Sequence, residues 1–338
     1  MRFTIAIYLL IFSIAAQAQF DSIEQSSSIS TENSVQEAEA VEEVLVIGEQ
    51  PGPGLWRASK GDHVLWIMGT LKPLPKKMTW RSQKAEAVLA QSQKYITPPS
   101  VDVHISTGNK FLLLPSLIGI RNHPEGKTLK EVLSPELYSR WQVLKKKYIG
   151  NTSGIEHWRP IFAANELYER AIDKNGLTEK NNIRRTLSKV AKENNVTKSG
   201  PGTTTEIENP RDTVKEFKKT SLDDIACFEK TIVRLETDID EMRARANAWA
   251  VGDVDALRKL PEADHHEVCN AIAFNAALAE KHGLQDIPQQ KLRYWLAEAE
   301  SALEQHESTF AVLPIIELLK PNGYLAALRA KGYVVEEP

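Results

Sequence analysis

The sequence predicts a mixed α/β (α+β) fold in which strands from the two ends of the chain form one central sheet. Strand-like runs occur near both ends, and roughly 170 residues between them carry apolar side chains at helical spacing. The composition is that of an ordinary globular protein, with 338 residues, 42% hydrophobic and 26% charged. The simplest architecture packs a large helical block over one shared sheet. We therefore expect a single domain over residues 44–338.

The first 43 residues are expected to lie outside that domain. A positively charged start at Met1-Arg2, an apolar run and the A-x-A site Ala16-Gln17-Ala18 together predict a secretory signal peptide, residues 1–18, cut after Ala18. Residues 19–43 are rich in Ser, Glu and Gln and contain no Lys or Arg, which predicts a disordered acidic linker. The protein is thus expected to be periplasmic or secreted. No later stretch approaches ~20 apolar residues, so we expect no membrane span in the mature chain.

The ordered part begins with strands. Val44–Gly48 is a short strand candidate that Pro51–Gly54 ends. The segment Leu55–Pro75 then predicts two strands joined by a turn at Lys60–His63. The second strand runs into Gly69-Thr70-Leu71-Lys72. A glycine after a buried strand lets the backbone turn sharply and directs the next side chains off the end of the sheet.

Helices are expected through the middle of the chain, because apolar residues recur at three- and four-residue intervals there. Ser134-Pro135-Glu136 is a helix start, with a capping serine and a proline in the first turn. The segment Ser199–Pro210 is expected to be a loop, and Pro98-Pro99 to end a strand over Lys94–Thr97. The expected helices are Trp80–Gln93, the one that begins at Ser134, Pro160–Lys174, Glu179–Glu193, Leu222–Ala250, a short helix to Leu260, His265–His282 and Pro288–Gln305.

The C-terminal end returns to strands. Thr309–Leu313 predicts a buried strand, Asn322–Ala330 a helix, and Tyr333–Val335 a last strand. Gly332 stands where a helix C-terminus usually has glycine.

The two cysteines, Cys227 and Cys269, form either a disulfide, which an oxidising compartment favours, or two buried thiols. His265, His266 and Cys269 lie one helical turn apart, at metal-ligand spacing. Structural metal sites usually need four ligands, so these three are weak candidates for a metal site.

Several function classes receive no support. The net charge of −3 gives no basic field for nucleic acid, and no phosphate-binding, dinucleotide or hydrolase motif is present. No cofactor is indicated. The seven tryptophans are expected mainly in the core; if they gathered in a cleft, they would instead bind a glycan or peptide.

Several stretches together resemble the TraB/GumN family, whose members are similar to Tiki-type metal-dependent proteases and to the erythromycin-esterase/ChaN-like group. The family's opening strand, turn and G-T-x-H motif correspond to Leu55–Gly61 and Gly69–Lys72. Its W-x-x-G-D element corresponds to Trp249–Asp253, and its end to Leu328–Val335. The resemblance implies an α/β fold that brings two G-x-x-H motifs together, and a metal site built from their histidines and an acidic residue.

This sequence departs from the family at each of those positions. Lys72 stands where the first motif has histidine, and Pro314-Ile315-Ile316-Glu317 replaces the second motif. The acidic residue would fall within Thr97-Pro98-Pro99. A protonated lysine has no lone pair for a metal ion. Lys72 and Glu317 are instead able to form an ion pair in place of the metal, either as a structural filler or as an acid–base pair with shifted pKa values.

These departures lead to three hypotheses. We favour an exported, non-catalytic relative of the family, a pseudoenzyme that binds or scaffolds and has lost the metal site. Gly69, Thr70, Lys72 and Glu317 mark the former site. The first alternative is an active peptidase- or esterase-like hydrolase with a rearranged site that uses Glu317, His63 or Asp62. The second is a glycan- or peptide-binding module.

Overall fold

The computed structural model describes residues 52–105, 113–207, 209–260 and 286–338. Four predicted segments lie outside these ranges and stay predictions. They are the signal peptide, the acidic linker, the strand over Val44–Gly48 and the helix over His265–His282. Within the described ranges, no helix is both long and apolar enough to cross a membrane. The single domain predicted over residues 44–338 likewise stays a prediction.

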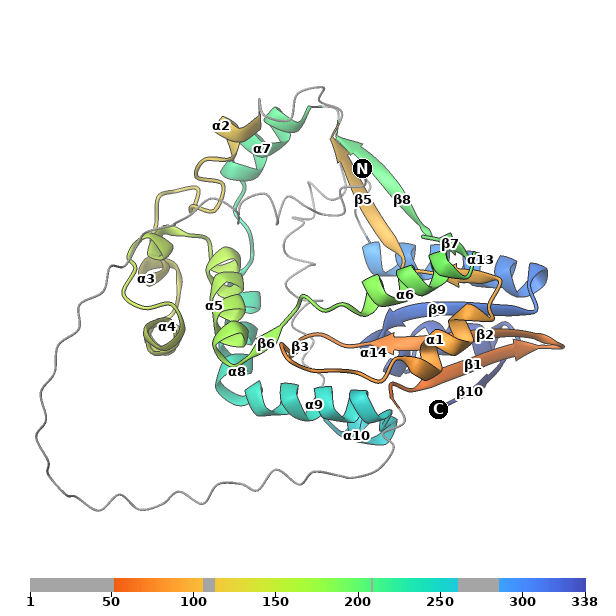
Figure 1. Cartoon of the computed structure of the whole chain (residues 1–338). Coiled ribbons are helices and arrows are strands. Elements are labelled where there is room, and N and C mark those ends of the chain that lie inside the picture. Colours follow the sequence, from red (N-terminus) through yellow and green to blue (C-terminus); the bar gives the residue numbers. More distant parts are fainter. Residues whose placement is uncertain (1–51, 106–112, 208, 261–285) are drawn as a thin grey trace, which may run out of the picture. The chain divides into compact units, whose positions relative to one another are not determined.

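A six-stranded mixed sheet joins the two ends of the described chain, as predicted (Figure 1). Strand β1 pairs antiparallel with both β10 and β2, while β2, β9, β4 and β7 run parallel to one another. The mixed α/β fold expected from the sequence is therefore confirmed. In spatial order the strands are β10 (Val334–Glu336), β1 (Leu55–Lys60), β2 (His63–Thr70), β9 (Ser308–Pro314), β4 (Lys94–Ile96) and β7 (Thr197–Ser199).

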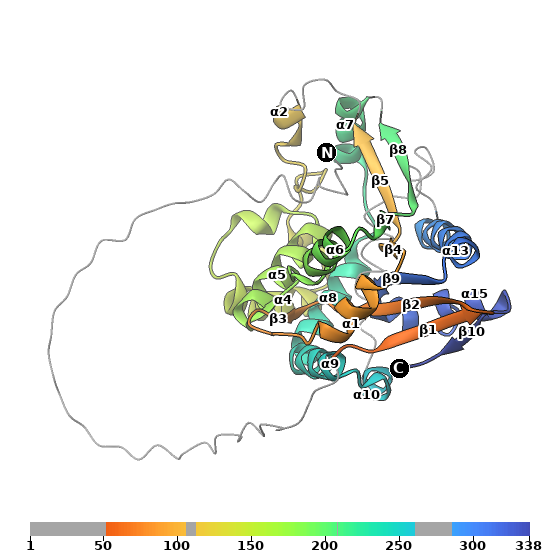
Figure 2. The same ribbon diagram turned by 45° about the vertical axis from the view of Figure 1, so that its right-hand side comes forward.

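Helices cover both faces of this sheet. The connections from β2 to β4 and from β4 to β7 move across the sheet in one direction, and those that lead to β9 and then β10 move in the other. Because such crossovers are right-handed, α1 (Gln83–Ala90) and α6 (Ile183–Glu193) lie on one face. On the other face lie α13 (Ile287–Gln305) and α15 (Tyr324–Ala330). Figure 2 shows α6 and α13 on opposite sides of the sheet.

Burial on both faces explains the continuous apolar runs of the central strands. Residues Phe310–Leu313 of β9 are all fully buried, as are Leu65, Ile67 and Met68 of β2. A strand that is covered on both faces has no side free for an alternating polar pattern. The continuous apolar runs of β2 and β9 are therefore clear signals of buried strands in the sequence.

The loop predicted over Ser199–Pro210 is wrong, because it contains strand β8 (Gly202–Ile207). Strand β8 pairs in parallel with β5 (Ser100–Ile105), which the sequence analysis did not predict. These two strands follow directly after β7 and β4. Pro98, Pro99 and Pro201 interrupt the ladder between the pairs, because proline has no N–H to donate. The β-branched run Thr203–Thr205 then resumes the pairing as a separate two-stranded sheet.

The middle of the chain is helical, as predicted, and encloses a second apolar core. A short two-stranded sheet links this block to the segment after β2. The short sheet consists of β3 (Leu74–Pro75) and β6 (Leu177–Thr178). The described helices of this block are α2 (Leu114–Leu117), α3 (Leu129–Val132), α4 (Pro135–Tyr148), α5 (Pro160–Lys174), α7 (Pro210–Lys219), α8 (Ile225–Thr237), α9 (Ile239–Val251) and α10 (Val254–Lys259).

The long helix predicted over Leu222–Ala250 is two helices, α8 and α9, which meet at Asp238. The carboxylate of Asp238 is buried and accepts hydrogen bonds from Arg234, at 3.1 Å, and from Arg245, at 2.6 Å. The apolar period continues across the break, so the pattern alone did not reveal it. A buried ion network fixes the corner between the two helices.

Arg159, at the start of α5, joins three segments of the helical block. Its side chain is 1% exposed and donates to four backbone carbonyls, those of Asn122, Phe217, Lys218 and Thr220, at 2.8–3.1 Å. Three of these carbonyls lie at the C-terminus of α7, where the helix itself supplies no donors. The guanidinium also stacks 4.7 Å from the ring of Phe217. Arg159 therefore acts as the cap of a helix distant from it in sequence.

Candidate functional site

The carboxyl edge is the name used here for the end of the sheet at which the parallel strands β2, β9 and β4 finish. In the register of these strands Thr70 is opposite Pro314, and Ile96 is opposite Ala311. The chain leaves β2 and β4 toward one face and β9 toward the other. Open α/β sheets usually bind ligands at the point where neighbouring strands diverge in this way. The three loops that follow these strands carry all three of the motif positions discussed above.

Gly69 and Thr70 hold the two loop starts together. A Cβ atom on Gly69 would lie 2.9 Å from Cγ1 of Ile315, so glycine is required there for close packing. Gly69 is still part of β2, and the sharp turn expected from the sequence does not explain it. The hydroxyl of Thr70 donates to the carbonyl of Leu313 at 3.2 Å. These contacts fix the loop after β2 against the loop after β9.

Trp249 fixes the same loop from the helical block. Its indole N–H donates to the carbonyl of Gly69 at 2.8 Å, and the side chain is fully buried. Gly252 follows in the left-handed conformation and ends α9, and Asp253 caps α10 by accepting from the N–H of Ala256 at 2.8 Å. The W-x-x-G-D element therefore positions the carboxyl edge.

Lys72 and Glu317 do not contact each other as an ion pair. Lys72 is exposed and makes no hydrogen bond or ion pair with the residues that the structure describes. Glu317 lies in α14 (Ile315–Leu319) and pairs with Lys320 at 3.1 Å. The ion pair that the sequence allowed is therefore absent, because a nearer lysine on the same short segment takes its place.

Sequence reasoning missed three further groups near Glu317. Lys291 of α13 is half-buried, and this burial lowers its pKa while Glu317 and Asp102 oppose that shift. Burial also raises the pKa of Tyr324, and Glu317 adds to the effect. Asp102 accepts from the hydroxyl of Ser100 at 3.1 Å, but its other carboxylate oxygen is buried without a partner. No motif marks Lys291 or Asp102, since only the tertiary fold brings α13 and β5 beside Glu317.

The donor set at the carboxyl edge does not fit the metal site that the resemblance implies. Lys72 carries a positive charge and has no lone pair for a metal ion. The hydroxyl of Thr97 already donates to the carbonyl of Ser199 at 3.1 Å. At the three motif positions, the carboxylate of Glu317 is the one side chain that could act as an anionic metal ligand. It is already paired with Lys320. In the described ranges no three His, Cys, Asp or Glu side chains gather in a way that could hold a metal ion.

The structure does not describe the three weaker metal candidates. His265, His266 and Cys269 lie outside the described residues. Cys227 lies buried in α8 and is disulfide-bonded. Its predicted pairing with Cys269 stays a prediction.

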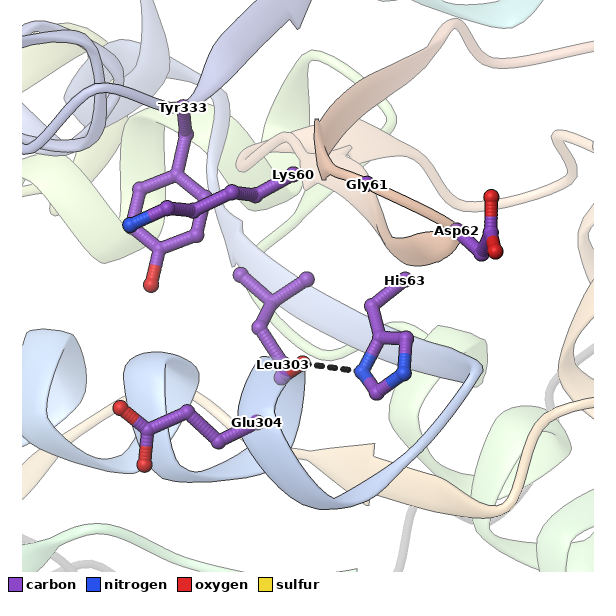
Figure 3. Close-up of a pocket in the computed structure, with 7 residues that line it drawn as sticks. All are labelled: Lys60, Gly61, Asp62, His63, Leu303, Glu304 and Tyr333. Carbon is purple, nitrogen blue, oxygen red and sulfur yellow. Dashed lines mark hydrogen bonds between the residues drawn. The ribbon is translucent and has the colours of Figure 1, made fainter.

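A pocket of about 380 Å³ lies at the end of β2 opposite to the carboxyl edge (Figure 3). There His63 Nδ1 donates to the carbonyl of Leu303 near the C-terminus of α13, and Lys60 lies 5.4 Å from the ring of Tyr333. The side chain of Asp62 points away from the other lining residues in Figure 3. His63 thus serves as a cap for the last turn of α13.

This geometry separates the residues proposed for a rearranged hydrolase site. His63 begins the eight-residue strand β2, whereas Glu317 follows the far end of the neighbouring parallel strand. With a rise of about 3.3 Å per residue, the two lie roughly 20 Å apart along the sheet. His63 and Asp62 therefore cannot act together with Glu317 on one substrate bond.

Most of the tryptophans lie in the core and are not available for a binding surface. Trp56, Trp141, Trp249 and Trp295 are fully buried, so these four of the seven cannot stack on a glycan. They contribute to the two apolar cores, as the sequence predicted.

The comparisons with known proteins gave one match. A family model described as the TraB/PrgY/gumN family matches residues 54–337. No curated protein and no solved structure matches the chain significantly.

Proposed function

Because the chain belongs to the TraB/PrgY/gumN family over residues 54–337, we propose that it is a non-catalytic member that binds a ligand or partner at the carboxyl edge. The observation that carries the proposal is the replacement of the implied metal ligands in an otherwise intact frame. Gly69, Thr70 and Trp249 keep the loops in place. Lys72 is a cation, and Glu317 is already paired with Lys320. Loops that are held in place, but carry no suitable metal ligands, support a binding function more than metal-dependent catalysis.

The metal content of the purified protein tests this proposal. We expect zinc, manganese and iron well below one per chain by elemental analysis, because Lys72 repels a cation and one carboxylate alone is a poor site. A stoichiometric metal would overturn the proposal. The variant Glu317→Gln then tells whether such a metal sits at the carboxyl edge, since only a metal held there is lost with that carboxylate.

An active hydrolase is the second candidate, and one observation favours it. Lys291 is desolvated beside Glu317 and Asp102, and enzymes often shift the pKa of an acid–base pair in this way. A screen of peptide and ester substrates with the wild type and with Glu317→Gln separates the two candidates. Our proposal expects no turnover by either protein, whereas turnover that the variant loses would establish the hydrolase.

We also propose that the chain is exported after cleavage at Ala18, to the periplasm or beyond. Cys227 is buried and disulfide-bonded, and disulfides form in oxidising compartments. Mass spectrometry of the exported protein is expected to find an N-terminal peptide that begins at Gln19, and alkylation of Cys227 and Cys269 only after reduction. Alkylation of both cysteines without reductant would contradict the predicted disulfide.

A further inference from the structure

The turn that contains α2, residues 113–120, is apolar and yet largely exposed. It carries no charged residue. Its two ends are anchored, since Leu113 and Ile120 are each only 7% exposed, but no residue of α2 itself is buried. Leu114 is 48% exposed and Ile118 is 77% exposed. Neighbouring apolar side chains that remain in water mark interaction sites more often than isolated ones do.

The C-terminal end of α7 places lysines beside this apolar turn. Figures 1 and 2 both show α2 next to α7, and Nζ of Lys218 donates to the carbonyl of Ile118 at 2.5 Å. Helix α7 has four basic and two acidic residues. One of the acidic residues, Asp212, lies in its first turn and pairs with Lys215 at 3.5 Å. Lys218 and Lys219 form no ion pair with any residue that the structure describes.

Arg159 holds the apolar turn and the basic helix end in one arrangement. Its guanidinium donates to the carbonyl of Asn122, two residues after the turn, and to the carbonyls of Phe217 and Lys218 in the last turn of α7. The exposed aliphatic side chains and the lysines are therefore presented together. A surface that is fixed before binding loses little conformational freedom when it binds.

We propose that Leu114, Ile118, Lys218 and Lys219, here called the α2–α7 patch, dock the protein on the surface of an anionic lipid bilayer. The aliphatic side chains enter the boundary between headgroups and acyl chains, and the lysines attract the anionic headgroups. Protein–protein interfaces are instead enriched in aromatic side chains and depleted in lysine, so the composition of the patch favours lipid over a protein partner. The inference goes beyond the proposed function and does not depend on the carboxyl edge.

Cosedimentation with lipid vesicles tests the inference. The vesicles contain phosphatidylcholine alone or an equal mixture of phosphatidylcholine and phosphatidylglycerol. The chain begins at Gln19, so the apolar run of the predicted signal peptide cannot bind lipid. The patch variants are Ile118→Asp and Lys219→Glu. Their matched controls are Val143→Asp, at a 66% exposed valine of α4, and Lys84→Glu, at an exposed lysine of α1. Circular dichroism verifies that each variant is folded.

We expect the protein to bind the anionic vesicles, less so as salt is added, and not to bind phosphatidylcholine alone. Each patch variant should lower the partition coefficient at least about fivefold, and the controls should bind as the wild type does. The inference is overturned if the anionic vesicles are not bound, if both lipids bind equally, or if Val143→Asp weakens binding as much as Ile118→Asp does. A dimer in light scattering that Ile118→Asp dissociates would also overturn it, because the patch would then be covered by a second copy.

Discussion

Replacement of Arg159 by alanine is expected to lower the free energy of unfolding by about 3–5 kcal/mol, the largest effect of any single charged residue considered above. The change removes a buried guanidinium that donates to four carbonyls, three of them at the C-terminus of α7. It also leaves Asp224 without the neighbouring cation that stabilises its ionised form. Chemical denaturation followed by circular dichroism measures the loss.

Two variants show whether the geometry of Arg159 matters as well as its charge. Arg159→Lys keeps the cation but lacks the planar fork that reaches several acceptors, so we expect it to recover only a small part of the loss. Arg293→Ala removes an exposed arginine of α13 that forms no ion pair with the described residues, and it should change stability by less than about 0.5 kcal/mol. Equal stability of the Arg159→Ala and Arg293→Ala proteins would refute the capping role.

Replacement of Trp249 by alanine is expected to cost about 3–5 kcal/mol, because the indole is fully buried between α9 and the sheet and its removal leaves a large cavity. The hydrogen bond to Gly69 adds a second effect, which Trp249→Phe isolates. That variant keeps an aromatic ring but leaves the carbonyl of Gly69 without its indole donor. Thermal and chemical unfolding measure both variants.

Trp295 provides the matched control for Trp249. It is equally buried, but its indole nitrogen has no hydrogen-bond partner among the described residues. We therefore expect Trp249→Phe to destabilise the protein by about 1–3 kcal/mol more than Trp295→Phe. If Trp249→Phe and Trp295→Phe lower the free energy of unfolding equally, the hydrogen bond from Trp249 to Gly69 does not stabilise the loop.

The frame of the carboxyl edge does not depend on the motif positions at which the resemblance implies metal ligands. The residues that fix the loops act through backbone and packing: Gly69 against Ile315, Thr70 on the carbonyl of Leu313, and Trp249 on the carbonyl of Gly69. None of these contacts involves a metal ligand. The side chains of Lys72 and Glu317 are therefore not needed to hold these loops in place.

The parts of the fold that were predicted correctly have strong local signals. Strands β2 and β9 are continuous apolar runs because helices cover both faces of the sheet. Helices α5 and α13 show a clear apolar period; α5 spans the expected residues, and α13 begins one residue before the expected start and ends at the expected residue. The loop prediction fails at strand β8 because Gly and Pro near its start are typical loop residues. Its partner β5 lies about a hundred residues earlier in the chain.

The sequence by itself determined the mixed α/β class, the pairing of the two chain ends in one sheet, and the presence of Lys72 and Glu317 where the resemblance implies histidines. Each of these depends on residue type or local period. Only the tertiary structure decided that Glu317 pairs with Lys320 and that Lys291 and Asp102 approach it. These proximities join residues of β5, α13 and α14, and no local pattern encodes the distance between elements so far apart in the chain. Charge interactions depend on that distance and on burial, so the electrostatics of the carboxyl edge follow from the fold.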